Sequence, residues 1–175
     1  EDGFIERLHW FIRLRWIAVV SIIIAVFFAE RTLKFSLPVF ALYSIAFLLA
    51  IYNSAAFLGL FYLDKRKSQL LSQVAYQFAR LQIFLDFLAL TILIHFSGGI
   101  ENPFIFYFIF HMIIASILLS RKDSFLQAMV VTLLLSSIVI GEYYGFLRHY
   151  CLKIFTSIDQ FRNTRYIFGM IFVFT

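Results

Sequence analysis

Four ionisable side chains lie inside long apolar stretches of this 175-residue chain: Asp86, His95, His111 and Glu142. An ionisable group surrounded by apolar sequence is costly to bury, so it usually faces a partner or a cavity. An imidazole titrates near neutral pH, which suits proton-coupled chemistry. Two interpretations follow: each group makes an inter-helix hydrogen bond that fixes packing, or His95, His111 and Glu142 line a ligand pocket. We expect no metal site, because no two histidines are spaced i, i+4 and the three residues come from different predicted helices.

A short segment between two apolar stretches carries further chemistry, because Gly98-Gly99-Ile100-Glu101 leads into Asn102-Pro103-Phe104. Two glycines end a helix, and Asn as N-cap with Pro at the first helical position starts another. Residues of these types commonly mark the turn between two antiparallel helices. A helix start also presents free N–H groups and a positive dipole end. With Phe104 and Tyr107 beside it, this segment could therefore hold a flat ligand that carries carbonyl oxygens.

The composition predicts an all-α integral membrane protein, because 62% of residues are hydrophobic, 14% are charged, and 24 Phe accompany only 2 Pro. A membrane β-barrel would alternate apolar and polar residues, whereas these apolar runs are continuous. The predicted transmembrane helices cover residues 10–28, 38–62, 81–97, 102–120 and 124–147, and a truncated sixth helix begins near residue 166. Residues 68–80 are expected to form a separate amphipathic segment at the membrane interface.

Charges and aromatic residues predict the orientation of this bundle. Arg13 and Arg15 are expected to reach the lipid headgroups, with Trp10 and Trp16 at the interface. Lys and Arg are more numerous in segments that lie inside when the N-terminus is cytoplasmic. The net charge of +5 then reports topology and anionic lipid better than nucleic-acid binding. The single cysteine, Cys151, excludes an internal disulfide.

Two further expectations concern packing and extent. Gly141 and Gly145 have the GxxxG spacing that lets another helix approach closely, and Asp86 is expected to pair with Arg80 or Gln82. Residues 1–175 are expected to form one sensor domain of a longer polypeptide. Both ends suggest a fragment: the chain starts with Glu1, and its last apolar run is too short to span a membrane.

Residues 98–104 match the GGxxNPF heptapeptide of the RegB/PrrB family of redox-responsive sensor histidine kinases. Arg80, Gln82 and Asp86 are similar to the third helix of that family, and residues 10–16 resemble its entry to the first. The resemblance implies a six-helix membrane domain, a cytoplasmic kinase domain, dimerisation, and ubiquinone as the signal. The redox-active cysteine of that family lies beyond its membrane domain, and Cys151 is not its equivalent.

The sequence thus predicts a sensing domain of a two-component sensor histidine kinase in the bacterial inner membrane. Ubiquinone or menaquinone is the expected ligand, and no catalytic residue is expected in this stretch. The expected partners are a second copy, the kinase domain, a response regulator and lipid. The candidate ligand-binding residues are His95, Gly98, Gly99, Asn102, Pro103, Phe104, Tyr107, His111 and Glu142. Alternatives are a small transporter or channel, an input domain with a different output enzyme and ligand, and an intramembrane enzyme using His95, His111 and Glu142.

Overall fold

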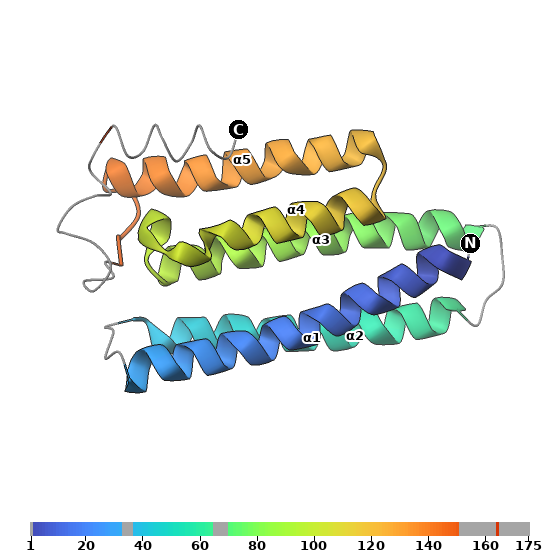
Figure 1. Cartoon of the computed structure of the whole chain (residues 1–175), viewed down its shortest axis with the longest axis horizontal. Helices are drawn as coiled ribbons and strands as arrows, with labels where there is room; N and C mark the ends of the chain where they lie inside the picture. Colours follow the sequence, from blue (N-terminus) through green and yellow to red (C-terminus); the bar gives the residue numbers. More distant parts are fainter. Residues whose placement is uncertain (1, 33–36, 65–69, 151–163, 165–175) are drawn as a thin grey trace.

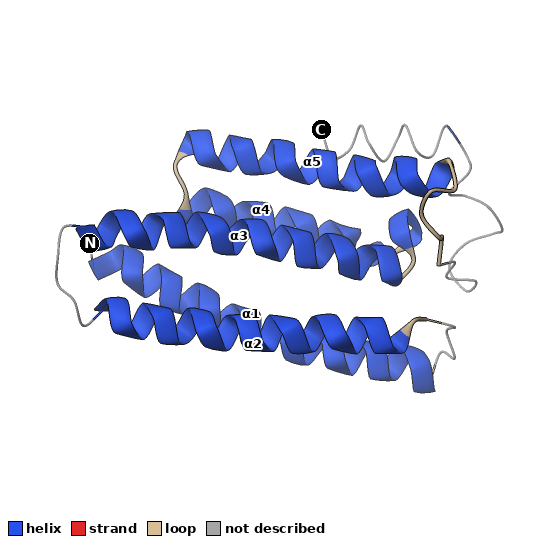
Figure 2. Cartoon of the chain, turned by 180° about the vertical axis from the view of Figure 1, so that it is seen from behind, coloured by secondary structure: helices blue, strands red, loops and turns tan. Residues whose placement is uncertain are grey.

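The computed structural model describes residues 2–32, 37–64, 70–150 and 164. In these ranges the fold is entirely helical, with no strand (Figure 2). A hairpin of α1 (Asp2–Arg31) and α2 (Val39–Asp64) packs beside a second group of α3 (Leu70–Phe96), α4 (Tyr107–Leu118) and α5 (Arg121–Tyr143) (Figure 1). These five helices confirm the predicted all-α fold. The predicted sixth helix, from residue 166, lies outside the described residues.

Helix α3 lies at the centre of the described bundle, because it contacts α2, α4 and α5. Its N-terminal part was expected to lie separately at the interface, and this prediction is wrong. Ala75, Ala79, Ile83 and Phe87 are all buried. They recur every four residues along one face, so the apolar stripe of residues 75–79 continues in register into the rest of the helix. A single helix can therefore bury the whole stripe against its neighbours.

The connection between α3 and α4 is built from two short 3-10 helices, η1 (Gly99–Glu101) and η2 (Pro103–Phe106). We call the end of the bundle that holds this connection the loop end. The C-termini of α1, α3 and α5 lie there, and the opposite end holds the N-terminus of α1 and the turn between α4 and α5 (Figure 1). We call that opposite end the turn end.

Helix α5 starts earlier than the sequence predicted. Ser120 is its N-cap, and the Ser120 hydroxyl accepts a hydrogen bond from the backbone N–H of Asp123 at 3.3 Å. Arg121 and Lys122 therefore belong to the first helical turn and not to the loop before it. The backbone N–H groups freed at a helix start explain why Ser and Asp favour these positions.

The GxxxG prediction for α5 is also wrong. Gly145 lies beyond the helix with a φ of 78°, so it ends α5 and does not extend a packing face. A Cβ atom at Gly141 would lie 2.8 Å from the side chain of Leu147, whose backbone N–H returns to the Gly141 carbonyl oxygen at 2.9 Å. Gly141 thus makes room for the chain that folds back after α5.

Four of the described helices are long and apolar enough to cross a membrane: α1, α2, α3 and α5. The segment Pro103–Leu118 is apolar but shorter. Many large apolar side chains on these helices are exposed, as expected of a surface that faces lipid. The chain is therefore a multi-pass membrane protein.

Candidate functional site

The connection at the loop end is held by the side chain of Asn102, which is buried. Its carbonyl oxygen accepts a hydrogen bond from the backbone N–H of Phe104 at 2.8 Å, and its amide donates to the carbonyl oxygen of Ser97 at 3.0 Å. Pro103 follows at the first position of η2, where its missing N–H costs nothing. The predicted Asn-Pro helix start is confirmed. The Asn102 side chain is occupied in shaping the connection, so any role in ligand binding would be indirect.

Beside this connection, four ionisable side chains form a chain of contacts that we call the loop-end cluster: His95, Glu101, Glu142 and His149. One oxygen of Glu142 lies 2.9 Å from Nδ1 of His95, and its other oxygen lies 2.8 Å from Nδ1 of His149. Nε2 of His149 lies 3.4 Å from a carboxylate oxygen of Glu101. The side chains of Glu101, Glu142 and His149 are each less than a tenth exposed. Helix α3, η1, α5 and the segment after α5 are thereby joined at one point.

The Glu142 carboxylate packs directly against the backbone of Gly99. A Cβ atom at residue 99 would meet both carboxylate oxygens of Glu142 well inside contact distance. Gly99 also has a φ of 56°, a conformation that L side chains rarely adopt. Glycine at this position therefore serves both the turn and the close approach of a buried carboxylate. The sequence predicted only the turn.

The electrostatics of the cluster favour a charged His149. Burial alone would lower the His149 pKa, but the hydrogen bond and negative charge of Glu142, with the charge of Glu101, raise it above its ordinary value of 6.5. Both ring nitrogens of His149 face carboxylates. Only the imidazolium can donate to both, since a neutral imidazole carries a single N–H. Glu101 accepts no hydrogen bond within the described residues, so its closest charge partner there is His149.

A second feature of the loop end faces outward. The rings of Phe104, Tyr107 and Phe110 follow one another with centroid separations of 5.7 and 5.8 Å. About half of Phe104 and Tyr107 is exposed, at 51% and 48%. His111 comes next in sequence, with Nδ1 3.1 Å from the Tyr107 carbonyl oxygen and its ring 6.0 Å from that of Phe87. We call Phe104, Tyr107 and Phe110 the aromatic strip.

The structure therefore divides the residues predicted to form one pocket. His95 and Glu142 are in direct contact next to Gly99, whereas the contacts of His111 are with Tyr107 and Phe87. Sequence reasoning missed Glu101 and His149. Glu101 was read as part of a turn, and His149 was placed in a connection with no assigned role. Their positions were an available signal, because both are ionisable and lie within ten residues of Gly98 or Glu142.

A different polar group lies deeper in the bundle, and we call it the Arg15 cluster: Arg15, Asn53, Gln82 and Asp86. Nη2 of Arg15 lies 2.7 Å from a carboxylate oxygen of Asp86, and both side chains are about 5% exposed. The guanidinium also donates to Asn53 at 3.0 Å and to Gln82 at 3.2 Å. This group joins α1, α2 and α3 through one cation.

Two sequence predictions are corrected by the Arg15 cluster. Arg15 does not reach toward lipid headgroups, because its guanidinium is buried between the rings of Phe11 and Tyr52 at 4.6 and 4.8 Å. Asp86 pairs with Arg15 and not with Arg80, which instead lies 3.5 Å from Asp123. Gln82 does join the group, but as an acceptor from Arg15. Helix α1 extends to Asp2, so residue 15 lies well inside the helix.

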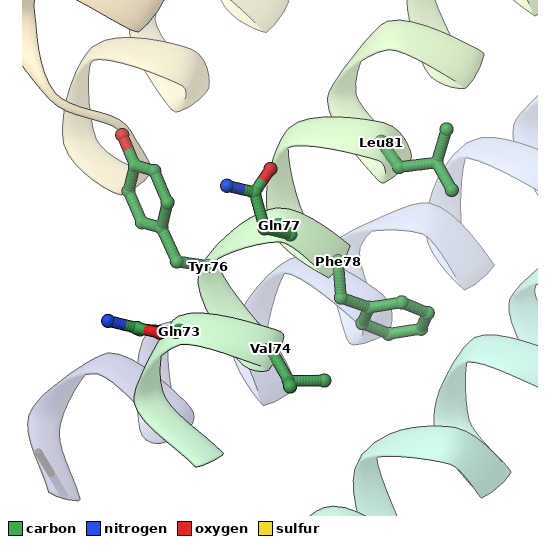
Figure 3. A pocket seen from close by; sticks show the side chains of 6 residues that line it. All are labelled: Gln73, Val74, Tyr76, Gln77, Phe78 and Leu81. Atoms are coloured by element: carbon green, nitrogen blue, oxygen red, sulfur yellow. The ribbon is translucent and has the colours of Figure 1, made fainter. Parts of the chain in front are cut away.

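An open groove of about 1020 Å³ lies along the first half of α3, near the turn end (Figure 3). Gln73, Val74, Tyr76, Gln77, Phe78 and Leu81 line this groove. The Tyr76 ring extends toward the turn between α4 and α5, where its hydroxyl donates to Asp123 at 2.5 Å and accepts from the Ser120 N–H at 2.8 Å (Figure 3). No ionisable cluster lines the groove, and it lies away from the predicted ligand site. Across the described residues, no group of three or more His, Cys, Asp or Glu has an arrangement that could hold a metal ion.

The chain resembles a class of membrane sensing domains. The family model of the PilS-like transmembrane domain, a six-helix domain, matches residues 2–171. The chain therefore belongs to that family, which supports a membrane sensor domain of histidine kinases and does not single out the RegB/PrrB family. No curated protein and no solved structure matches the chain.

Proposed function

We propose that this chain is the input domain of a two-component sensor histidine kinase, and that its ligand is ubiquinone or menaquinone bound at the aromatic strip. The observation that best supports a quinone ligand is the row of exposed rings that starts at the Asn102-Pro103 connection. A quinone dissolved in lipid is flat, and it can stack on rings that face the bilayer. The resemblance of residues 98–104 to the heptapeptide of the quinone-responsive kinases supports the same ligand.

We assign each predicted site residue a role that agrees with its contacts. Phe104 and Tyr107 supply ring surface to the ligand, and the His111 imidazole offers a nitrogen to a quinone oxygen from the next position on α4. Gly98, Gly99, Asn102 and Pro103 act by setting where the strip begins. His95 and Glu142 lie behind the connection, where they hold α5 against it. Ligand binding at the strip would therefore change the position of the connection between α3 and α4.

The same proposal includes the membrane location, the assembly and the signalling partners of the domain. The domain sits in the bacterial inner membrane with a cytoplasmic N-terminus and works as a homodimer. It passes its signal through the last helix to a kinase domain and on to a response regulator. A channel or transporter would use helices broken near the middle of the membrane. The described spans α1, α2, α3 and α5 are continuous instead.

Quinone binding to the chain in nanodiscs tests the ligand. We expect saturable binding in the micromolar range that Phe104→Ala and Tyr107→Ala each weaken about tenfold, equivalent to about 1.4 kcal/mol. Phe40→Ala is the matched control, because Phe40 is a lipid-exposed aromatic residue on α2, outside the strip. Binding that none of the three substitutions weakens would indicate partitioning into lipid, and equal losses in all three would reject the strip as the site. Absence of saturable binding by the folded parent would reject the quinone and leave the sensing domain without an assigned signal.

A further inference from the structure

The loop-end cluster holds the segment that follows α5 against the bundle. Helix α5 ends at Tyr143, and the next described residues, up to Tyr150, are not helical. His149 attaches them to the bundle, because its Nδ1 meets Glu142 and its Nε2 faces Glu101, and the Leu147 N–H adds a hydrogen bond to the Gly141 carbonyl oxygen. The chain then continues into residues 151–175. A change at His149 therefore acts on the route by which a signal leaves the described bundle.

The charges around His149 come from every element packed there. Helix α3 contributes His95, η1 contributes Glu101, and α5 contributes Glu142. The segment itself contributes Arg148, whose guanidinium lies 5.5 Å from the Tyr150 ring, and that ring packs edge-on against His95 at 5.7 Å. His149 lies between two carboxylates, so the loss of its proton removes the positive charge that the described residues place between Glu101 and Glu142. Such an arrangement is costly because like charges at short range repel in a poorly solvated site.

We propose that the loop-end cluster is a proton-binding switch: it holds residues 147–150 against α3 and α5 while His149 is protonated, and it releases them when His149 loses its proton. The ligand is the proton, and the residues are distinct from those assigned to quinone, so this inference goes beyond the proposed function. The raised pKa of His149 agrees with the geometry. The held state is complete below pH 6.5 and is lost as the pH rises through the raised pKa.

Site-directed spin labelling of the whole chain in nanodiscs tests the switch. Phe146 is 85% exposed and lies between Glu142 and His149, so Phe146→Cys in a Cys151→Ser background carries one label. We expect low label mobility at pH 6 and a rise in mobility with a midpoint above pH 6.5. His149→Gln should remove the pH dependence, and Glu142→Gln should lower the midpoint by about one pH unit. His9→Gln is the matched control, because His9 lies near the start of α1 and outside both sites, and its midpoint should equal that of the parent.

Three results would overturn the switch: mobility independent of pH in the parent, an unchanged midpoint in a folded His149→Gln variant, or a pH response that EDTA abolishes. The last result would assign the response to a bound metal ion. If His149→Gln fails to fold, NMR titration of the ¹³C-labelled histidine rings of the parent decides. The His149 midpoint must then coincide with the mobility midpoint, and separate midpoints reject the proposal. All measurements are made without quinone, so they stand or fall independently of quinone binding.

Discussion

The Arg15 cluster and the loop-end cluster both bury opposite charges between helices, but the first is built around a guanidinium and the second around histidines. Arg15 stays protonated at any physiological pH, and its guanidinium is shared among Asp86, Asn53 and Gln82. The loop-end cluster replaces that fixed cation with two imidazoles. The first arrangement suits permanent packing of α1, α2 and α3. The second suits a contact that forms and breaks.

Position along the bundle supports the same division. Asp86 lies ten residues before the end of α3 at Phe96, so roughly 15 Å of helix separates it from the loop end. The Arg15 cluster is buried in the bundle, with its guanidinium against the rings of Phe11 and Tyr52. The loop-end cluster lies where the helices end and where protons from water can arrive. Comparable charges therefore serve different purposes because of where the fold places them.

Removing the carboxylate of the Arg15 cluster should give the largest loss of stability. Asp86→Ala leaves a buried guanidinium without its anion, and we expect the free energy of unfolding to fall by about 3–5 kcal/mol. Arg80→Ala, which breaks the more exposed pair with Asp123, should cost much less. Unfolding by denaturing detergent measures both. Equal losses in the two variants would contradict a special role for the buried pair.

A methyl group at Gly99 should disturb the loop-end cluster more than the same change at Gly145. Both glycines have positive φ, but only at Gly99 would the added Cβ meet another residue, the Glu142 carboxylate. Gly145→Ala should cost about 1 kcal/mol from backbone strain alone. Gly99→Ala should cost more, about 2–4 kcal/mol, and should shift the His149 titration measured by NMR. A Gly99→Ala variant with an unshifted His149 titration would show that the close approach is unimportant.

The sequence predicted the connection at Asn102-Pro103 better than it predicted the Arg15 cluster. The Asn102-Pro103 helix start was predictable because capping is local, and each partner lies within five residues. The partner of Asp86 was not, because Arg15 lies 71 positions away and its place in the bundle depends on how α1 packs. Asn53 and Arg15 within apolar runs were the available signal, since buried polar groups need partners.

The fold itself was predictable where composition decides it. Long apolar runs can cross a membrane only as helices or a closed barrel, so the helices near residues 10–28 and 124–147 were predicted close to α1 and α5. Their ends were not, because a helix stops where capping and packing stop it. Residues 68–80 were misjudged for the same reason. Their polar residues suggested an interface, whereas their small and apolar residues, such as Ala75 and Ala79, pack inside.

The pH dependence of stability tests most directly the claim that the proton of His149 holds the loop-end cluster together. For the parent chain, the free energy of unfolding should fall by about 1–2 kcal/mol as the pH rises through the His149 pKa, which lies above 6.5, because the imidazolium–carboxylate hydrogen bonds are lost. His149→Gln should abolish that fall, and Asp86→Asn should lower stability while keeping it. A fall that persists in His149→Gln, or that disappears in Asp86→Asn, would contradict the account.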